Sequence, residues 1–140
     1  MSDNIIKVGA GVVIIKDGET LLTKRHGAHA EGTYGSLGGH VEFGETPTET
    51  VKREAREELG IEVGNLRFAT CVNMVKYGKH YVDISFVADI ISGEPIIMEP
   101  DRIESVGWYD LNNLPEPLFE PVRIVLEQIK SGVSYKEIEG

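Results

Sequence analysis

Three glutamates, Glu54, Glu57 and Glu58, lie within one short segment of the chain. Carboxylates grouped in this way are the oxygen ligands that divalent cations such as Mg²⁺ and Mn²⁺ prefer. On a helix, the three side chains fall within an arc of roughly 100° that borders the apolar stripe. At about 6 Å and an effective dielectric constant of about 20, each pair repels by about 2.8 kcal/mol before screening. The pattern therefore favours a bound cation that offsets the repulsion.

The segment around these glutamates has the start and stop signals of a helix. Thr46 and Glu49 form a capping box, Pro47 suits the first helical position, and Gly60 suits the end. The buried stripe of this helix is predicted to be Val51, Ala55 and Leu59. A Glu- and Arg-rich helix is more often a solvated face. The glycine-rich loop before it, together with Glu45 and Gly60, favours the metal site instead.

The elements on either side of this helix predict a mixed sheet. Apolar and β-branched runs predict strands over residues 5–16, from 21 onward, 37–41, 66–75, 80–91 and 103–109, and a closing helix over 119–129. Residues 26–36 are rich in small residues and are predicted to form a loop. The order β-β-β-α-β-β-β-α indicates an α/β (α+β) fold with helices packed on the sheet.

Composition limits the classes of protein that this chain can represent. Its 140 residues are near the commonest size of a single domain, so we predict one domain over 1–140 with a core at about 5–130. No apolar run approaches the roughly 20 residues of a membrane span. The net charge of −9 argues against a protein that coats a nucleic-acid polymer. Cys71 is the only cysteine, which predicts no internal disulfide and a cytoplasmic location.

At this point the sequence resembles a known family. The Nudix signature is G-x5-E-x7-R-E-U-x-E-E-x-G-U, where U is a bulky aliphatic residue. Eight of its nine fixed positions are met over 23 residues, and the ninth is the smaller Ala55. The matching residues are Gly39, Glu45, Arg53, Glu54, Glu57, Glu58, Gly60 and Ile61. The flanks are similar to the MutT-like branch, although Ser36-Leu37 stands where relatives carry Leu-Pro, which predicts a looser loop.

The resemblance implies a Nudix-type α/β/α sandwich, a loop-helix-loop metal site and a set of residue roles. Glu54, Glu57 and Glu58 would hold Mg²⁺ or Mn²⁺ together with the Gly38 carbonyl. Arg53 and Glu45 would orient the glutamates, supported by Gly39. Glu58 and Glu54 rank first as general base. The candidates for contacts to the substrate are Arg25, His40, His80, Glu99, Asp101 and Glu104.

The resemblance also implies a hydrolase of a phosphoanhydride. The leading expectation is cleavage of a nucleoside or deoxynucleoside triphosphate to the monophosphate and pyrophosphate, with nucleotide-pool sanitation as a role. The alternatives are another nucleoside diphosphate linked to X, such as ADP-ribose, a nucleotide sugar or dihydroneopterin triphosphate, and a non-catalytic nucleotide sensor. The expected partner is a small nucleotide, with no nucleic-acid polymer and no membrane, and a homodimer is the expected assembly.

Overall fold

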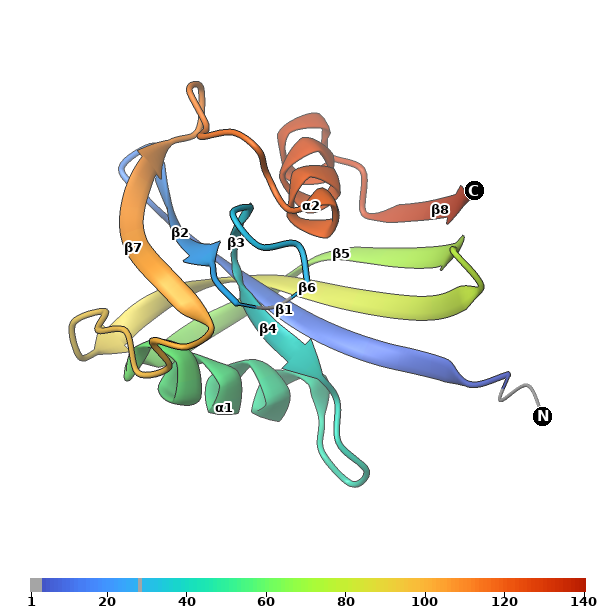
Figure 1. Cartoon of the computed structure of the whole chain (residues 1–140), viewed down its shortest axis with the longest axis horizontal. Coiled ribbons are helices and arrows are strands. Elements are labelled where there is room, and N and C mark those ends of the chain that lie inside the picture. The colour runs from blue at the N-terminus through green and yellow to red at the C-terminus, as the bar shows by residue number, and fades with distance from the viewer. Residues whose placement is uncertain (1–3, 28) are drawn as a thin grey trace.

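A computed structural model describes residues 4–27 and 29–140, and it consists of a mixed sheet between two helices (Figure 1). The helices are α1 (Pro47–Leu59) and α2 (Glu120–Ser131). The strands are β1 (Ile6–Lys16), β2 (Glu19–Arg25), β3 (Tyr34–Gly35), β4 (Leu37–His40), β5 (Glu62–Lys76), β6 (Lys79–Ser92), β7 (Ile103–Asp110) and β8 (Tyr135–Glu139).

Strand β1 organises the sheet because it pairs with three other strands. It runs parallel to β6 over most of its length and antiparallel to β4 from Gly9 to Val12, and its last two residues pair with β2. β2 pairs in turn with β7 and β3, and β5 lies between β6 and β8. In the described part of the chain, β4 pairs with β1 alone, so the opposite edge of β4 is open to other groups.

The two helices cover opposite faces of the sheet because neighbouring side chains of a strand point to opposite sides. Val12 and Ile14 belong to one core cluster, which also contains the α1 residues Val51, Ala55 and Leu59. Val13 belongs to the other cluster, together with residues of α2. This arrangement confirms the predicted α/β/α sandwich. None of the helices in the described ranges is long and apolar enough to cross a membrane.

The predicted element order is confirmed in its main parts and incomplete in two. The region predicted as a loop over 26–36 contains the short strand β3. The closing helix is followed by β8, which the sequence did not predict. β8 is mostly polar and exposed, and it pairs through its backbone with Cys71–Val75 of β5, so it lacks the apolar alternation that marks a strand. Cys71 itself is only partly buried, not a core residue.

The segment before α1 forms the short strand that its sequence predicted over 37–41. Leu37 replaces the proline that relatives carry, yet it is only 3% exposed and pairs with Val12 in the ladder between β4 and β1. A leucine retains the backbone N–H that proline lacks and adds apolar surface to the α1-side core. Leu37 is thus held in a paired strand, and the effect of the missing proline on the loop stays a prediction.

Candidate active site

Helix α1 presents the candidate site, and both of its ends form as predicted. Thr46 accepts a hydrogen bond from the backbone N–H of Glu49, whose side chain accepts one from the N–H of Thr46. Gly60 ends the helix in the left-handed conformation at φ 65°, which a residue with a Cβ adopts only with strain. Val51, Ala55 and Leu59 are all 0% exposed, so the direction in which the glutamates point is fixed.

Arg53 is the centre of a network of carboxylates. Its Nε donates to Glu45 at 2.8 Å, and its Nη1 donates to Glu54 at 2.9 Å and to Glu57 at 3.3 Å. Its Nη2 donates to Glu45 at 3.1 Å and to the carbonyl of His40 at 3.4 Å. One guanidinium therefore contacts three carboxylates and fastens α1 to the end of β4, and the supporting role of Arg53 in the reaction stays a prediction.

Glu45 is the most strongly held carboxylate of this network. Besides Arg53, it accepts hydrogen bonds from the Thr50 hydroxyl at 2.7 Å and the Glu42 N–H at 3.1 Å. These partners, Arg53 first, lower the pKa of Glu45 to about 2. The sequence reasoning missed Thr50 and Glu42. Thr50 could have been identified from its spacing, because it follows Glu45 by five residues across the start of the helix.

Glu54 and Glu58 form the buried part of the site. They lie one helical turn apart and are in contact. Glu58 also accepts a hydrogen bond from the N–H of Gly38 at 3.3 Å. Burial raises the pKa of both groups, and the negative charge of Glu54 adds to this effect at Glu58, whose pKa rises to about 8. A pair of carboxylates taken out of water in this way is an environment that a divalent cation would stabilise.

Two glycines of β4 let neighbouring elements pack closely against this strand, each for a different reason. A Cβ on Gly39 would overlap the carboxylate of Glu54. A Cβ on Gly38 would lie 2.6 Å from the carbonyl oxygen of Ala10 and 2.9 Å from the Cα of Gly11. Gly39 therefore makes room for the glutamate, whereas Gly38 lets β4 pack against β1.

The third predicted ligand, Glu57, is placed differently from the other two. Its side chain is 49% exposed and is held by Arg53, whereas the side chain of Glu54 is 18% exposed. Across residues 4–27 and 29–140, no group of three or more His, Cys, Asp or Glu side chains is arranged as a ready metal site. The donor set that fits a hard cation is thus the Glu54–Glu58 pair beside Gly38, with Glu57 at its solvent edge.

Arg25 is a predicted substrate residue that lies close enough to Glu58 to feel its charge. It is partly buried, its Nε donates to the carbonyl of His29 at 3.0 Å, and its guanidinium lies 4.4 Å from the centre of the Phe119 ring. Burial lowers the pKa of Arg25, and the negative charge of nearby Glu58 opposes that change. A guanidinium held in this way beside the buried carboxylates is well suited to contact a phosphate.

The later acidic candidates are only partly brought to the site. Glu99 lies close enough to Glu58 for its charge to help raise the pKa of Glu58. Glu104 instead forms ion pairs with Lys24 at 3.1 Å and with His26 at 3.8 Å. Asp101 is exposed, and its carbonyl lies against Gly27. Of these three, Glu99 is the one whose charge acts on the paired glutamates.

The two histidine candidates lie on opposite faces of the sheet. His40 follows Gly39 at the end of β4 and stacks on Tyr81, with ring centres 6.0 Å apart and an interplanar angle of 22°. His80 is the neighbour of Tyr81 in β6, so it points to the other face, where it forms a 2.7 Å hydrogen bond with Asn73. The structure therefore separates His80 from His40, and His80 points to the face of the sheet that α1 covers.

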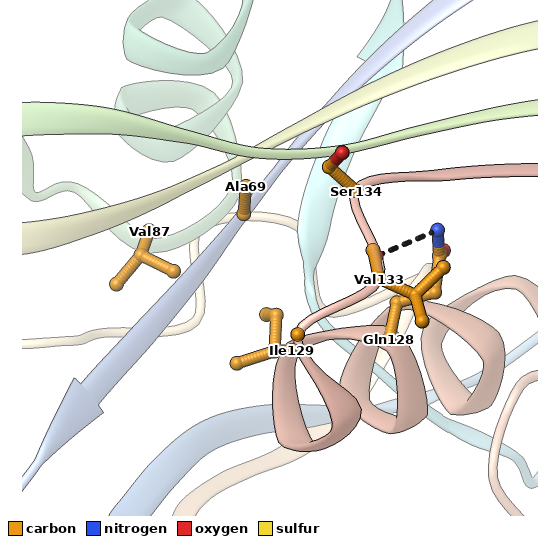
Figure 2. A pocket seen from close by; sticks show the side chains of 7 residues that line it. Ala69, Val87, Gln128, Ile129, Val133 and Ser134 are labelled. Carbon is orange, nitrogen blue, oxygen red and sulfur yellow. Dashed lines mark hydrogen bonds between the residues drawn. The ribbon is translucent and has the colours of Figure 1, made fainter.

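Two hollows of the surface lie outside this site. One, of about 720 Å³, lies at the ends of β1 and β6 beside Trp108. The other, of about 220 Å³, lies between the end of α2 and strands β5 and β6 (Figure 2). In Figure 2 the side-chain amide of Gln128 donates a hydrogen bond to the carbonyl of Val133, across from Ala69 and Val87. None of the predicted site residues lines either hollow.

The hydrogen bonds of Glu45 predict a pH-dependent contribution to stability. Because its pKa falls from 4.5 in the unfolded chain to about 2 in the folded protein, its contribution is complete above about pH 4.5 and is lost as the pH falls toward 2. The free energy of unfolding of wild type and Glu45→Gln, measured between about pH 3 and pH 7, should differ most at neutral pH and converge in acid.

The matched control for this measurement is Glu127→Gln. Glu127 is 59% exposed and pairs with Arg123 on the surface of α2, so its removal should change stability little at any pH. A difference between wild type and Glu45→Gln that stays constant from neutral pH into acid would contradict the prediction.

Comparison with known proteins agrees with this geometry. Residues 6–129 match the NUDIX domain family. The chain is similar to the NAD-capped RNA hydrolase NudC of Pseudomonas aeruginosa, at 36% identity over 104 residues, and to that of Pectobacterium atrosepticum, at 33% over 132 residues. These alignments cover 74% and 92% of this chain but only 36% and 50% of the relatives, so the chain spans at most half of their length.

A solved structure resembles the whole fold more closely. The MutT NUDIX hydrolase from Burkholderia pseudomallei superposes with a TM-score of 0.84 at 40% identity, and the match covers 89% of this chain and 98% of that protein. The chain belongs to the NUDIX domain family, as its loop, glutamates and helix predicted.

Proposed function

We propose that this chain hydrolyses a phosphoanhydride bond in a nucleoside diphosphate linked to a further group X. A nucleoside triphosphate is included, since X is then phosphate. The observation that carries the proposal is the Glu54–Glu58 pair, buried beside Gly38 and Gly39 on a Nudix frame. Mg²⁺ or Mn²⁺ bound there would supply Lewis acidity and offset the charge of the phosphate chain.

The chain's own residues divide the remaining work. Arg25 lies where it can contact a phosphate oxygen, and Arg53 holds Glu54 and Glu57 in fixed directions. Glu58 is suited to accept a proton from the attacking water, because its carboxylate lies at the buried end of the site beside Glu54 and Gly38. The hydrogen bond from the Gly38 N–H holds the Glu58 carboxylate at the edge of β4.

The identity of X is the finer part of the proposal. The curated relatives are named as hydrolases of NAD-capped RNA, in which a nucleotide is joined through a diphosphate to a longer chain. Their names support a diphosphate linked to X more directly than the triphosphate that we expected. They also remove the ground for excluding nucleic acid as part of X, although the net charge of −9 still argues against a broad basic RNA-binding surface.

The test is a panel of nucleoside triphosphates, ADP-ribose, NAD, nucleotide sugars and an NAD-capped oligonucleotide, incubated with Mg²⁺ or Mn²⁺. Release of a nucleoside monophosphate that stops on chelation is the expected result. Measurable cleavage that continues unchanged in chelator would overturn the role of the cation. Absence of cleavage across the panel would overturn the proposed activity and favour the nucleotide-sensing alternative.

Arg25→Ala is expected to lower kcat/KM for the cleaved substrate by about 10- to 100-fold, because a charge-assisted hydrogen bond to phosphate is lost. Steady-state kinetics on the best substrate of the panel provide the measurement. Arg123→Ala, which removes an exposed arginine of α2, is the control and should retain wild-type kinetics. If both variants retain them, the phosphate contact assigned to Arg25 is wrong.

A further inference from the structure

Phe119, the residue before α2, covers one face of the Arg25 guanidinium. The carbon at the centre of the guanidinium lies 4.4 Å from the centre of the Phe119 ring. Both residues are partly buried, and at this distance a cation and the face of an aromatic ring attract each other. Phe119 therefore contacts the side chain that is assigned to the phosphate, although it was not among the predicted site residues.

The ring of Phe119 is held on several sides. The Phe119 N–H donates to the carbonyl of Tyr34 at 2.8 Å, and the Phe119 carbonyl accepts from the N–H groups of Val122 and Arg123 in the first turn of α2. The side chain packs against the core cluster on the α2 side. A Cβ on Gly35 would lie 3.6 Å from the Cβ of Phe119, so β3 also lies close to this side chain. The ring is thus a fixed surface on which a guanidinium can stack.

The backbone and Nε of Arg25 are held as well. The ladder between β2 and β7 shifts by one residue at this point, so Arg25 pairs with Ile103. The Arg25 N–H donates to the carbonyl of Thr33 at 2.9 Å, and Nε donates to the carbonyl of His29 at 3.0 Å. Within residues 4–27 and 29–140, the two Nη groups of Arg25 form no hydrogen bond or ion pair. These groups are the donors that a phosphate would use.

The position of Arg25 relative to Glu58 gives this stacking a consequence. The negative charge of Glu58 acts on Arg25, yet the two form no ion pair in the described part of the chain. A guanidinium that was free to move would pair with the carboxylates of Glu54 and Glu58, since opposite charges attract strongly where water is scarce. Such a pair would occupy the oxygen atoms that a hard cation requires, and the phosphate would lose its donors.

We propose that Phe119 is a positioning residue that keeps Arg25 apart from Glu58, an inference that rests on the hydrolysis proposed for this site. Stacking on Phe119 leaves the carboxylates to the cation and the Nη groups to the phosphate. The two charged groups therefore keep separate tasks although they attract each other. Without the aromatic face, the guanidinium would move to the carboxylates and compete with the cation.

Binding of Mn²⁺ alone, measured by the electron paramagnetic resonance signal of the free ion, tests the proposal without turnover. Phe119→Leu keeps an apolar side chain but removes the aromatic face. It should bind Mn²⁺ about tenfold more weakly than wild type, the size of a partly desolvated cation–π contact. Phe119→Tyr keeps the face and should bind like wild type. The matched control is Phe68→Leu, the same change at a residue of β5 whose ring packs on Phe86, and it should also bind like wild type.

Removal of Arg25 distinguishes positioning from a general effect on the fold. In an Arg25→Ala background, Phe119→Leu should leave the Mn²⁺ affinity unchanged, because no guanidinium remains to compete for Glu58. A ring that only supports the core would cause the same loss with and without Arg25. Unchanged affinity in Phe119→Leu, an equal loss in both backgrounds, or an equal loss in Phe119→Tyr or Phe68→Leu would overturn the proposal.

Failure of the proposed hydrolysis is seen separately. In that case the Mn²⁺ affinities follow the expected pattern, but none of the panel substrates is cleaved. A protein that cleaves a panel substrate and binds Mn²⁺ equally well as wild type and as Phe119→Leu would instead overturn the role of Phe119 alone. Wild type that binds no Mn²⁺ would overturn the role of Phe119 together with the cation site.

Discussion

Glu58→Gln is expected to lower kcat by a factor on the order of 10²–10⁴, because the variant loses both a carboxylate ligand and the proposed proton acceptor. The fold should persist, since glutamine has the same shape and its amide oxygen can accept the 3.3 Å hydrogen bond from Gly38. Steady-state turnover of the best panel substrate, at saturating Mg²⁺, provides the measurement. Circular dichroism on the same samples shows that the fold remains.

The same variant should change the pH dependence of folding in a defined direction. The pKa of Glu58 rises from 4.5 in the unfolded chain to about 8 in the folded protein. Between these values the unfolded chain binds fewer protons, so wild type loses stability as the pH rises. Glu58→Gln lacks this ionisable group. In the presence of chelator, its free energy of unfolding should therefore increase relative to that of wild type from about pH 5 to pH 8.

A cation provides a further readout besides turnover. Mg²⁺ that binds the folded state should raise the Tm of wild type by mass action and raise that of Glu58→Gln much less. Glu62→Gln is the control, because Glu62 pairs with Arg56 on the solvent side of α1. Wild-type turnover in Glu58→Gln, or an equal Mg²⁺-induced rise in Tm in both proteins, would remove Glu58 from the site.

The helix and its supporting network could be predicted because their signals are local. The capping box, the stripe of Val51, Ala55 and Leu59, and the Arg53–Glu57 spacing all depend on residues within one or two helical turns. Spacing of this kind specifies geometry, because the helix fixes the rise and rotation of each residue. The family resemblance then added Glu45, whose link to Arg53 spans eight residues.

The features that the sequence did not predict depend on distant contacts. β8 is held by backbone pairing with β5 about 64 residues earlier, and its own side chains give no periodic signal. Leu37 is a core residue only because β4 pairs with β1.

Arg53→Ala is expected to destabilise the fold by about 3 kcal/mol and to reduce turnover as well, because a single guanidinium holds several carboxylates. Its side chain is 24% exposed, and its partners Glu45 and Glu54 are 15% and 18% exposed. Solvent reaches these charges only in part. If Arg53 is removed, the carboxylates lose their compensating charge, and the free energy of unfolding falls far more than it does when a surface pair is lost. Glu54 and Glu57 would also lose the hydrogen bonds that direct them. Urea unfolding gives the change in stability.

Arg56→Ala is the matched control for this prediction, since it lies on the same helix and also pairs with a glutamate. Arg56 is 55% exposed and Glu62 is 43% exposed, so solvent screens their 2.7 Å pair, and its removal should cost about 1 kcal/mol or less without affecting turnover. The contrast between two arginines three residues apart isolates the effect of buried carboxylates from that of charge or helix propensity. Equal losses of stability in the two variants would show that Arg53 stabilises α1 as an ordinary surface residue, and its role in orienting the glutamates would then be wrong.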